Sequence, residues 1–162
     1  MNLTQRAKQI INETLYLSLA TSFNNETWVS PLWFAVDKDL NFYFVSEFGS
    51  KHATFIKQNP NVAFSVFNSA EKPEDVNGLQ ISAKAYEVLL TEVPHALQTI
   101  FQKEGADLFK LRFKDWNNPK TYLNLSKFRI YKLVPDHFWI LDTEVIETDK
   151  RVELTKSSLL QG

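Results

Sequence analysis

The apolar residues before residue 15 recur at helical spacing, whereas those over residues 15–22 recur at every second position. This change of period constrains the fold more than any other feature of the chain. Every second residue from Leu15 to Thr21 is Leu or Thr, and the residues between them, such as Ser18 and Ala20, form a different face. Alternation of this kind predicts a β-strand with one face against a core. The preceding apolar residues, by contrast, recur at helical spacing, so the strand follows a short amphipathic helix.

The same reasoning extends along the whole chain. We predict strands over residues 15–22, 27–36, 41–46, 61–68, 79–90, 121–134 and 137–141. We predict helices over residues 3–13, 50–59, 93–101 and 106–115. We predict irregular or poorly patterned segments over residues 68–77, 116–120 and 143–162.

The phase of the apolar residues changes inside the segment 79–90, from odd positions at Leu79 and Ile81 to even positions at Val88 and Leu90. Such a slip predicts a β-bulge, which is common where a sheet curls. Short antiparallel strands with inserted helices predict a mainly β fold with helices (α+β). We expect a small closed or split antiparallel barrel with helices on its outside.

The composition of the chain excludes several classes of function. The 162 residues, 44% of them hydrophobic, suit a single domain over 1–162, with 143–162 as an extended or mobile tail. Lys and Arg number 18 and Asp and Glu 19, so the net charge of -1 gives no global field for nucleic acid. The chain has no Cys, which excludes disulfides and thiolate chemistry. No apolar run reaches the roughly 20 residues of a membrane span. We expect a soluble, cytoplasmic protein.

The stretch "EFGSKHATFIKQNP", residues 47–60, places Ser50, Lys51 and His52 at the start of a helix that directly follows a strand. The first turn of a helix presents unpaired N–H groups and the positive end of the helix dipole. A hydroxyl, an ammonium and an imidazole there would complete a phosphate site. The alternative, which is the commoner case, is that Ser50 only caps the helix and Lys51 is solvated.

A second stretch, "WVSPLWF", places Pro31 inside a predicted strand between Trp28 and Trp33. Proline removes one donor from a sheet, so it indicates an edge, a kink, or backbone that faces a ligand. An aromatic strand with interrupted pairing would suit a flat heterocycle. The alternative is that both Trp side chains are core residues.

The order of these motifs resembles the pyridoxamine 5'-phosphate oxidase-like group of FMN-binding split barrels. The resemblance lies in "LYLSLATS", "WVSPLWFAVDKDLNFYFVSEFGSKHATFIKQNPNVAFSVF" and, near the end, "FRIYKLVPDHFWILD". It implies a split antiparallel barrel that forms a homodimer, with two FMN sites at the interface and a small-molecule substrate. The first strong match covers residues 1–90, and the last includes the pair Phe138-Trp139.

The resemblance also implies which residues contact FMN. It places Ser50, Lys51 and His52 at the FMN phosphate, and Val45 and Ser46 beside the ribityl chain and phosphate. The other implied positions line the ring or reach it from the second subunit. The ring positions are Pro31, Leu32, Trp33 and Phe34, and those from the second subunit are Gln80 and Trp139.

Three departures from the family pattern bear on the reaction, and one of them is that "TWVSPLWF" lacks the Arg-rich start of the family's second strand. True pyridoxamine phosphate oxidases carry an Arg-x-His-type substrate motif after the Phe-Trp pair, but here "ILDTEVIETDKRVEL" has no His. Oxidation of pyridoxamine phosphate is therefore not expected. In the phosphate step, Lys51-His52 replaces Arg-Lys, which weakens the grip on an anion because Lys lacks the bidentate fork.

Three functional hypotheses remain from the sequence. The first is an FMN-dependent oxidoreductase for a small organic molecule, in which no catalytic residue is identified. The second is a non-catalytic carrier or sensor that binds flavin, another planar cofactor such as haem, or nothing. The third is an empty barrel that serves only dimerisation. The three His residues lack the spacing of metal ligands, so no metal site is expected.

Overall fold

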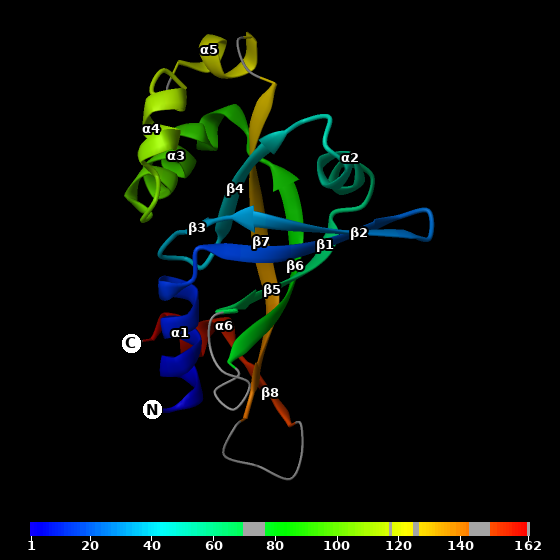
Figure 1. The fold of residues 1–162 in the computed structure, drawn as a ribbon, viewed down its shortest axis with the longest axis vertical. Helices are drawn as coiled ribbons and strands as arrows, with labels where there is room; N and C mark the ends of the chain where they lie inside the picture. Colours follow the sequence, from blue (N-terminus) through cyan, green and yellow to red (C-terminus); the bar gives the residue numbers. More distant parts are fainter. Residues whose placement is uncertain (70–76, 117, 125–126, 143–149, 162) are drawn as a thin grey trace.

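A strongly curled antiparallel sheet forms the centre of the molecule, and helices cover parts of its outside (Figure 1). The structure, a computed structural model, describes residues 1–69, 77–116, 118–124, 127–142 and 150–161. The strands are β1 Tyr16–Phe23, β2 Glu26–Trp33, β3 Ala35–Val36, β4 Phe42–Glu47, β5 Asn61–Phe67, β6 Gly78–Glu87, β7 Phe128–Leu141 and β8 Arg151–Leu154. The helices are α1 Leu3–Glu13, α2 Lys51–Gln58, the 3₁₀ turn η2 Leu90–Glu92, α3 Val93–Gln102, α4 Asp107–Phe113, α5 Pro119–Asn124 and α6 Lys156–Leu160.

The strand order defines a split barrel. Neighbouring strands follow the order β2-β1-β5-β6-β7-β4-β3, all pairs are antiparallel, and β8 adds to β7. Within the described part of the chain, β2 and β3 stand at the two ends of this order and are not paired with each other. The sheet therefore curls without closing, and the predicted α+β split antiparallel barrel is confirmed.

The interior of the curled sheet is one apolar core. Alternate residues of β1, β5 and β6 point into it, as the two-residue period predicts. Phe42 and Phe64 meet edge to face there, with ring centroids 4.9 Å apart. Helix α1 adds Ala7 and Ile11, which lie at i and i+4 on its apolar face.

A second core lies between β4, β7 and the layer of helices α3–α5 (Figure 1). Its packing is largely aromatic: the rings of Phe113 and Trp116 lie 4.0 Å apart, and Trp116 meets Tyr122 edge to face. The Tyr122 hydroxyl accepts a hydrogen bond from the backbone N–H of Ile130 at 2.9 Å, which ties helix α5 to strand β7. Trp116 is thus a core residue.

The predicted strands 121–134 and 137–141 are wrong in their bounds. Residues Pro119–Asn124 form helix α5, and the strand begins only at Phe128. The helix starts because Pro119 suits a first helical position, and the Asn118 side chain accepts a hydrogen bond from the Lys120 N–H at 3.0 Å. From Phe128 the chain continues as one strand to Leu141, through Pro135.

The bulge lies on a different strand from the one predicted. Residue 136 is the extra residue, because Ser82 pairs with His137 whereas Ala83 pairs with Pro135. Strand β6 itself keeps one phase from Leu79 to Ala85, near its end at Glu87, so the change of phase marks the end of a strand. The bulge on β7 also accommodates Pro135, whose missing N–H would interrupt a regular ladder.

Two further boundaries differ from the prediction. The strand predicted over 27–36 is interrupted at Phe34, which separates β2 from β3 and packs into the interior core. The segment predicted as a tail contains β8, which pairs with β7, and α6, which packs against α1. Most of the predicted loop 68–77 and the residues 143–149 lie outside the described residues.

Candidate functional site

His52 is the centre of a polar cluster at the start of helix α2. Its Nδ1 lies 3.0 Å from the hydroxyl of Ser30 on β2. Its Nε2 lies 2.7 Å from the hydroxyl of Ser46, at the end of β4, and 3.1 Å from the hydroxyl of Ser50. The Ser46 and Ser50 hydroxyls are themselves 3.2 Å apart. Three hydroxyls and one imidazole thus converge where β2, β4 and α2 meet.

The environment of His52 keeps its ring neutral. The residue is buried, and its ring meets Phe44 edge to face at 5.9 Å. Burial lowers the pKa of His52 below its ordinary value, because the charged form would lose its hydration. A neutral imidazole offers one donor and one acceptor, and the serine hydroxyls on both sides can match either tautomer.

The first turn of α2 has unpaired donors. Ser50 occupies the N-cap position, but its side chain makes no cap hydrogen bond. Among the described residues, the backbone N–H groups of Lys51, His52 and Ala53 have no hydrogen-bond acceptor. Together with the hydroxyls of Ser46 and Ser50, these groups can bind an anion.

Lys51 is directed away from this cluster. Its ammonium pairs with the Glu26 carboxylate at the start of β2 and lies 4.6 Å from the centre of the Trp28 ring. A second aromatic ring, that of Phe55, lies 5.6 Å away. The cation of the "GSKH" stretch is therefore held by the β1–β2 hairpin, and Trp28, which is 43% exposed, is not a core residue.

The positions expected to line a flavin ring lie on an open edge. Among the described strands, β2 pairs with β1 and has no neighbour along its other edge, and Pro31 is exposed opposite Ser18. Leu32 is half-buried and Phe34 is buried in the interior core. Trp33 stacks on Phe109 of helix α4, with the ring centroids 4.7 Å apart. Of the alternatives for Pro31, the structure shows a sheet edge, and whether this edge faces a ligand stays a prediction.

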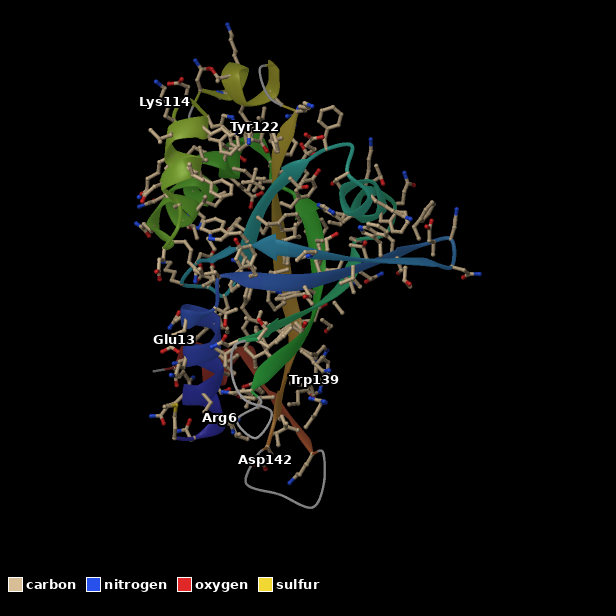
Figure 2. All side chains as sticks on the ribbon, in the orientation of Figure 1. Arg6, Glu13, Lys114, Tyr122, Trp139 and Asp142 are labelled. Carbon is tan, nitrogen blue, oxygen red and sulfur yellow. The ribbon has the colours of Figure 1, made fainter. Side chains whose placement is uncertain are left out.

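Val45 precedes Ser46 on β4 and packs at the margin of the second core, so only Ser46 of this pair joins the polar cluster. Gln80 and Trp139 are cross-strand neighbours on β6 and β7, on the outer face of the sheet. They line a shallow groove of about 430 Å³ whose floor consists of small residues such as Ser18 and Ala63. Figure 2 shows Trp139 on the lower half of β7, at the far end of the molecule from Tyr122.

The structure therefore brings Ser46, Ser50 and His52 together, but it does not bring Gln80 or Trp139 of the same chain to them. The sequence reasoning missed Ser30. Its signal was present, because Ser30 shares strand parity with Leu32 and so occupies the core-facing side of a predicted strand. A polar residue at such a position needs a hydrogen-bond partner, and His52 provides it.

No group of three or more potential metal-ligating side chains gathers anywhere in the described ranges. Over the same part of the chain, every helix is too short or too polar to cross a membrane.

The curled antiparallel sheet with its open seam defines the protein as a split barrel with helices on its outside. The family model described as "Pyridoxamine 5'-phosphate oxidase" matches residues 3–137, which is most of the chain. The chain therefore belongs to the pyridoxamine 5'-phosphate oxidase family, and the resemblance seen in the sequence is confirmed.

Solved structures share this fold at low sequence identity. The haem-binding protein from Mycobacterium smegmatis is 14% identical, with a TM-score of 0.74 over 99% of this chain and 60% of that one. The haem storage protein HutZ from Vibrio cholerae is 21% identical, with a TM-score of 0.60 over 84% and 92% of the two chains. General stress protein 26 from Bacillus anthracis is 21% identical, with a TM-score of 0.58 over 95% and 100%. No curated protein matches the sequence.

Proposed function

We propose that the protein binds FMN and acts as an oxidoreductase on a small organic molecule. The observation that carries the proposal is the convergence of Ser46, Ser50 and the unpaired first-turn amides of α2, which offers a phosphate group several donors at once. Membership of the family supports the choice of FMN among phosphate-bearing ligands. Bound FMN would supply hydride or electron transfer, which no side chain can provide.

The residues of this chain would hold the cofactor and tune its surroundings. Ser46 and Ser50 would donate to the phosphate, and the exposed backbone edge at Pro31–Trp33 would face the ring. His52 would position both hydroxyls rather than supply charge, because its ring is neutral and buried. The donors of this phosphate site are neutral, because Lys51 is paired with Glu26. Neutral donors bind an anion less strongly than charged ones, so we expect FMN affinity to be moderate rather than tight.

The protein is not proposed to oxidise pyridoxamine phosphate, although the family takes its name from that reaction. The substrate motif that follows the Phe-Trp pair in true oxidases is absent, since no His follows His137 in the sequence. A different small molecule would therefore meet the flavin. The alternative is that the protein binds FMN but catalyses no reaction, and acts as a carrier or sensor.

We also propose a homodimer through the outer sheet face. Gln80 and Trp139 lie on that face, so they would approach the α2 cluster only from a second chain. The face is lined by small residues and carries Val29 with 62% of its surface exposed. An apolar, small-residue surface of this kind suits self-association. Light scattering of Val29→Lys against the unaltered chain tests this, and a monomer in both cases would contradict it.

The first experiment is an absorption spectrum of the purified protein before and after addition of FMN and desalting. Flavin bands that survive desalting, and that weaken in Ser50→Ala, support the proposal. A Ser157→Ala variant, at an exposed position on helix α6, is the matched control for loss of one hydroxyl. Oxidation of NADH or NADPH with an acceptor, only when FMN is present, would separate an enzyme from a carrier.

A second candidate ligand is haem, and a specific observation favours it. The exposed His137 places its Nδ1 2.5 Å from the Glu153 carboxylate, and among the described residues its Nε2 has no partner. Its ring stacks beside Trp139 with centroids 5.4 Å apart. Histidines that bind metals are commonly oriented by such a carboxylate. A Soret band that appears with haem and is lost in His137→Ala would support haem, whereas an unchanged band would reject His137 as the ligand.

A further inference from the structure

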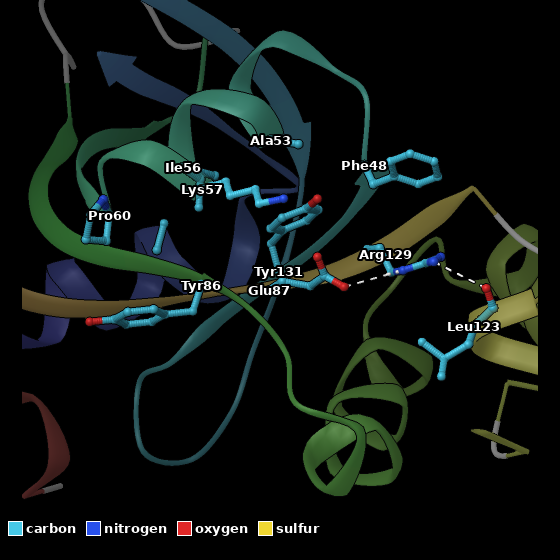
Figure 3. A pocket seen from close by; sticks show the side chains of 11 residues that line it. Phe48, Ala53, Ile56, Lys57, Pro60, Tyr86, Glu87, Leu123, Arg129 and Tyr131 are labelled. Carbon is cyan, nitrogen blue, oxygen red and sulfur yellow. Dashed lines mark hydrogen bonds and ion pairs between the residues drawn. The ribbon is translucent and has the colours of Figure 1, made fainter. Parts of the chain in front are cut away.

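A cavity of about 660 Å³ lies between helix α2 and the ends of strands β6 and β7 (Figure 3). Helix α2 contributes Ala53, Ile56 and Lys57, which lie on one helical stripe at i, i+3 and i+4, and Pro60 follows the end of the helix. His52 and Phe55 are directed instead towards the β1–β2 hairpin, through Ser30 and Phe23. The cavity thus lies against a different stripe of α2 from the polar cluster.

The walls of the cavity are mainly apolar and aromatic. Ile56, Pro60 and Leu123 form apolar parts of the lining, and the rings of Phe48 and Tyr86 stand at its margin. Phe48 is 55% exposed and Tyr86 48% exposed, which is unusual for two aromatic rings beside one cavity. The volume lies within the range of roughly 300–1,000 Å³ that is typical of small-molecule sites.

One buried polar group inside the cavity has no partner. Tyr131 is only 3% exposed, and its ring is fixed by stacking on Phe44 with centroids 5.1 Å apart. Among the described residues, its hydroxyl has no hydrogen-bond partner, although every fully shielded side-chain N or O atom in that part of the chain has one. The hydroxyl must therefore reach the cavity, where Figure 3 shows it beneath α2 on the side of Lys57. Burial and the charge of Glu87 raise the pKa of Tyr131, so the hydroxyl remains a donor.

The charged side chains that line the cavity carry a net charge of +1, from Lys57, Arg129 and Glu87. Arg129 pairs with Glu87, with its Nε 3.4 Å from the carboxylate, and donates to the carbonyl oxygens of Phe128 and Leu123. Lys57 also lines the cavity, and no acidic partner lies within ion-pair distance of it in the described ranges. A ligand with one negative charge would balance Lys57 and accept the hydrogen bond of Tyr131.

We propose that this cavity is a second ligand site, separate from the cofactor site, that binds a small molecule with an aromatic body and one carboxylate. The aromatic body contacts Ile56, Leu123 and the rings of Phe48 and Tyr86. The carboxylate accepts a hydrogen bond from Tyr131 and pairs with Lys57. The proposal does not depend on FMN, because none of these side chains belongs to the cluster around His52.

The test uses 2-naphthoate as the probe and the neutral 2-naphthalenemethanol as its matched analogue, each titrated into the full chain by calorimetry. We expect saturable binding of 2-naphthoate and weaker binding of the alcohol. Tyr131→Phe keeps the stacked ring and removes only the hydroxyl. It should therefore weaken the binding of 2-naphthoate by roughly tenfold and leave the binding of the alcohol nearly unchanged. Lys57→Gln, a substitution at an exposed position that leaves the fold intact, should also weaken the binding of 2-naphthoate. Lys38→Gln, on the β3–β4 turn, is the control.

Amide chemical shifts then locate the probe. Changes confined to Ala53, Ile56, Tyr86 and Tyr131 support the cavity, and retained binding of 2-naphthoate in the presence of saturating FMN supports a separate site. The proposal is overturned if 2-naphthoate does not saturate at millimolar concentration, or if both Tyr131→Phe and Lys57→Gln bind it as well as the unaltered chain. Displacement of the probe by FMN would also overturn it.

Discussion

The Nε2 atom of His52 lies 2.7 Å from the hydroxyl oxygen of Ser46, and this short contact joins the start of helix α2 to the end of strand β4. The same ring contacts Ser30 through Nδ1, so a single neutral imidazole links three elements of the fold. Because both nitrogens are occupied by hydroxyls, His52 positions the donors around it. In the proposed phosphate site, His52 would therefore hold the serine hydroxyls in place, whereas the sequence led us to expect a direct contact with the phosphate.

We predict that His52 makes the stability of the protein depend on pH. Its folded pKa is lowered by burial, so below the unfolded value of 6.5 the unfolded chain binds more protons than the folded one. The contribution is present above pH 6.5 and is lost progressively as the pH falls through the folded pKa. Urea unfolding of the unaltered chain and of His52→Gln, at pH 8, 6.5 and 5.5, measures it.

At pH 8 the His52→Gln variant should be less stable by about 1–3 kcal/mol, the cost of disturbing a buried hydrogen-bond cluster. This difference should shrink on acidification, because only the unaltered chain loses the contribution of His52. The contacts of His95 and His137 with carboxylates are common to both proteins and cancel in the comparison. A difference that stays constant with pH would contradict the prediction.

We predict that Glu26→Gln strengthens FMN binding. The Glu26 carboxylate holds the Lys51 ammonium beside Trp28, away from the unpaired amides of α2. Removal of the negative charge would free Lys51 to approach an anion at the helix start. The expected gain is roughly two- to fivefold, on the scale of an exposed ion pair, and it should diminish in high salt.

Fluorescence quenching of FMN measures this gain, and Glu13→Gln on helix α1 is the matched control. The double variant Glu26→Gln with Lys51→Gln should return the affinity to the level of the unaltered chain or below. If Glu26→Gln weakens FMN binding, the ion pair itself supports the site, and the proposed competition is wrong.

We predict that Asp37→Asn destabilises the fold. Asp37 is buried and accepts hydrogen bonds from the N–H of Asn41 at 2.8 Å and from the hydroxyl of Tyr43 at 3.0 Å. Burial alone would raise its pKa, but the hydrogen bonds from Asn41, His95 and Tyr43 outweigh it, so the pKa of Asp37 lies below its ordinary value. Its stabilising contribution is present above pH 3.8 and is lost as the pH falls through the folded pKa.

Asp37→Asn should lower the free energy of unfolding by about 2 kcal/mol at pH 7, since an amide cannot accept all of these hydrogen bonds. The exposed neighbour Asp39→Asn should change it by less than about 0.5 kcal/mol. Thermal or urea unfolding reports both values. Equal effects of the two substitutions would show that the hydrogen bonds of Asp37 contribute little.

We predict that Tyr122→Phe loosens the helix layer. The Tyr122 hydroxyl accepts from the buried N–H of Ile130, and its loss would leave that donor without a partner. The expected cost is about 1–3 kcal/mol, with faster hydrogen exchange at Ile130. Tyr16→Phe, at a site 59% exposed, is the control and should be nearly neutral. Unchanged exchange at Ile130 would contradict the prediction.

The two-residue period predicted most of the sheet because it follows directly from one-sided burial, as in β1 and β6. It failed over residues 121–124, where Tyr122 and Leu123 look strand-like but belong to a short helix held by tertiary packing of Tyr122. Propensity cannot identify such a helix, because its stability comes from the core it enters.

The candidate site was predictable in position and less so in geometry. The sequence indicated Ser50 and His52 correctly as neighbours at a helix start that follows a strand. It could not show that Lys51 turns towards Glu26, because that pair joins residues 25 positions apart. The cavity at Tyr131 could not be predicted from the sequence either, because its lining comes from five separate segments of the chain.

Strand β7 pairs with β6 along one edge and with β4 and β8 along the other. If the strands that precede β7 pair during synthesis as they do in the folded structure, they would form two pieces of sheet, β2-β1-β5-β6 and β3-β4, and β6 and β4 would each lack a neighbour along one edge. Synthesis of strand β7 would then join the two pieces, because β7 pairs with both β6 and β4. A translational pause before residue 128 would leave both edges exposed to other nascent chains, and this is where we expect misassembly to begin.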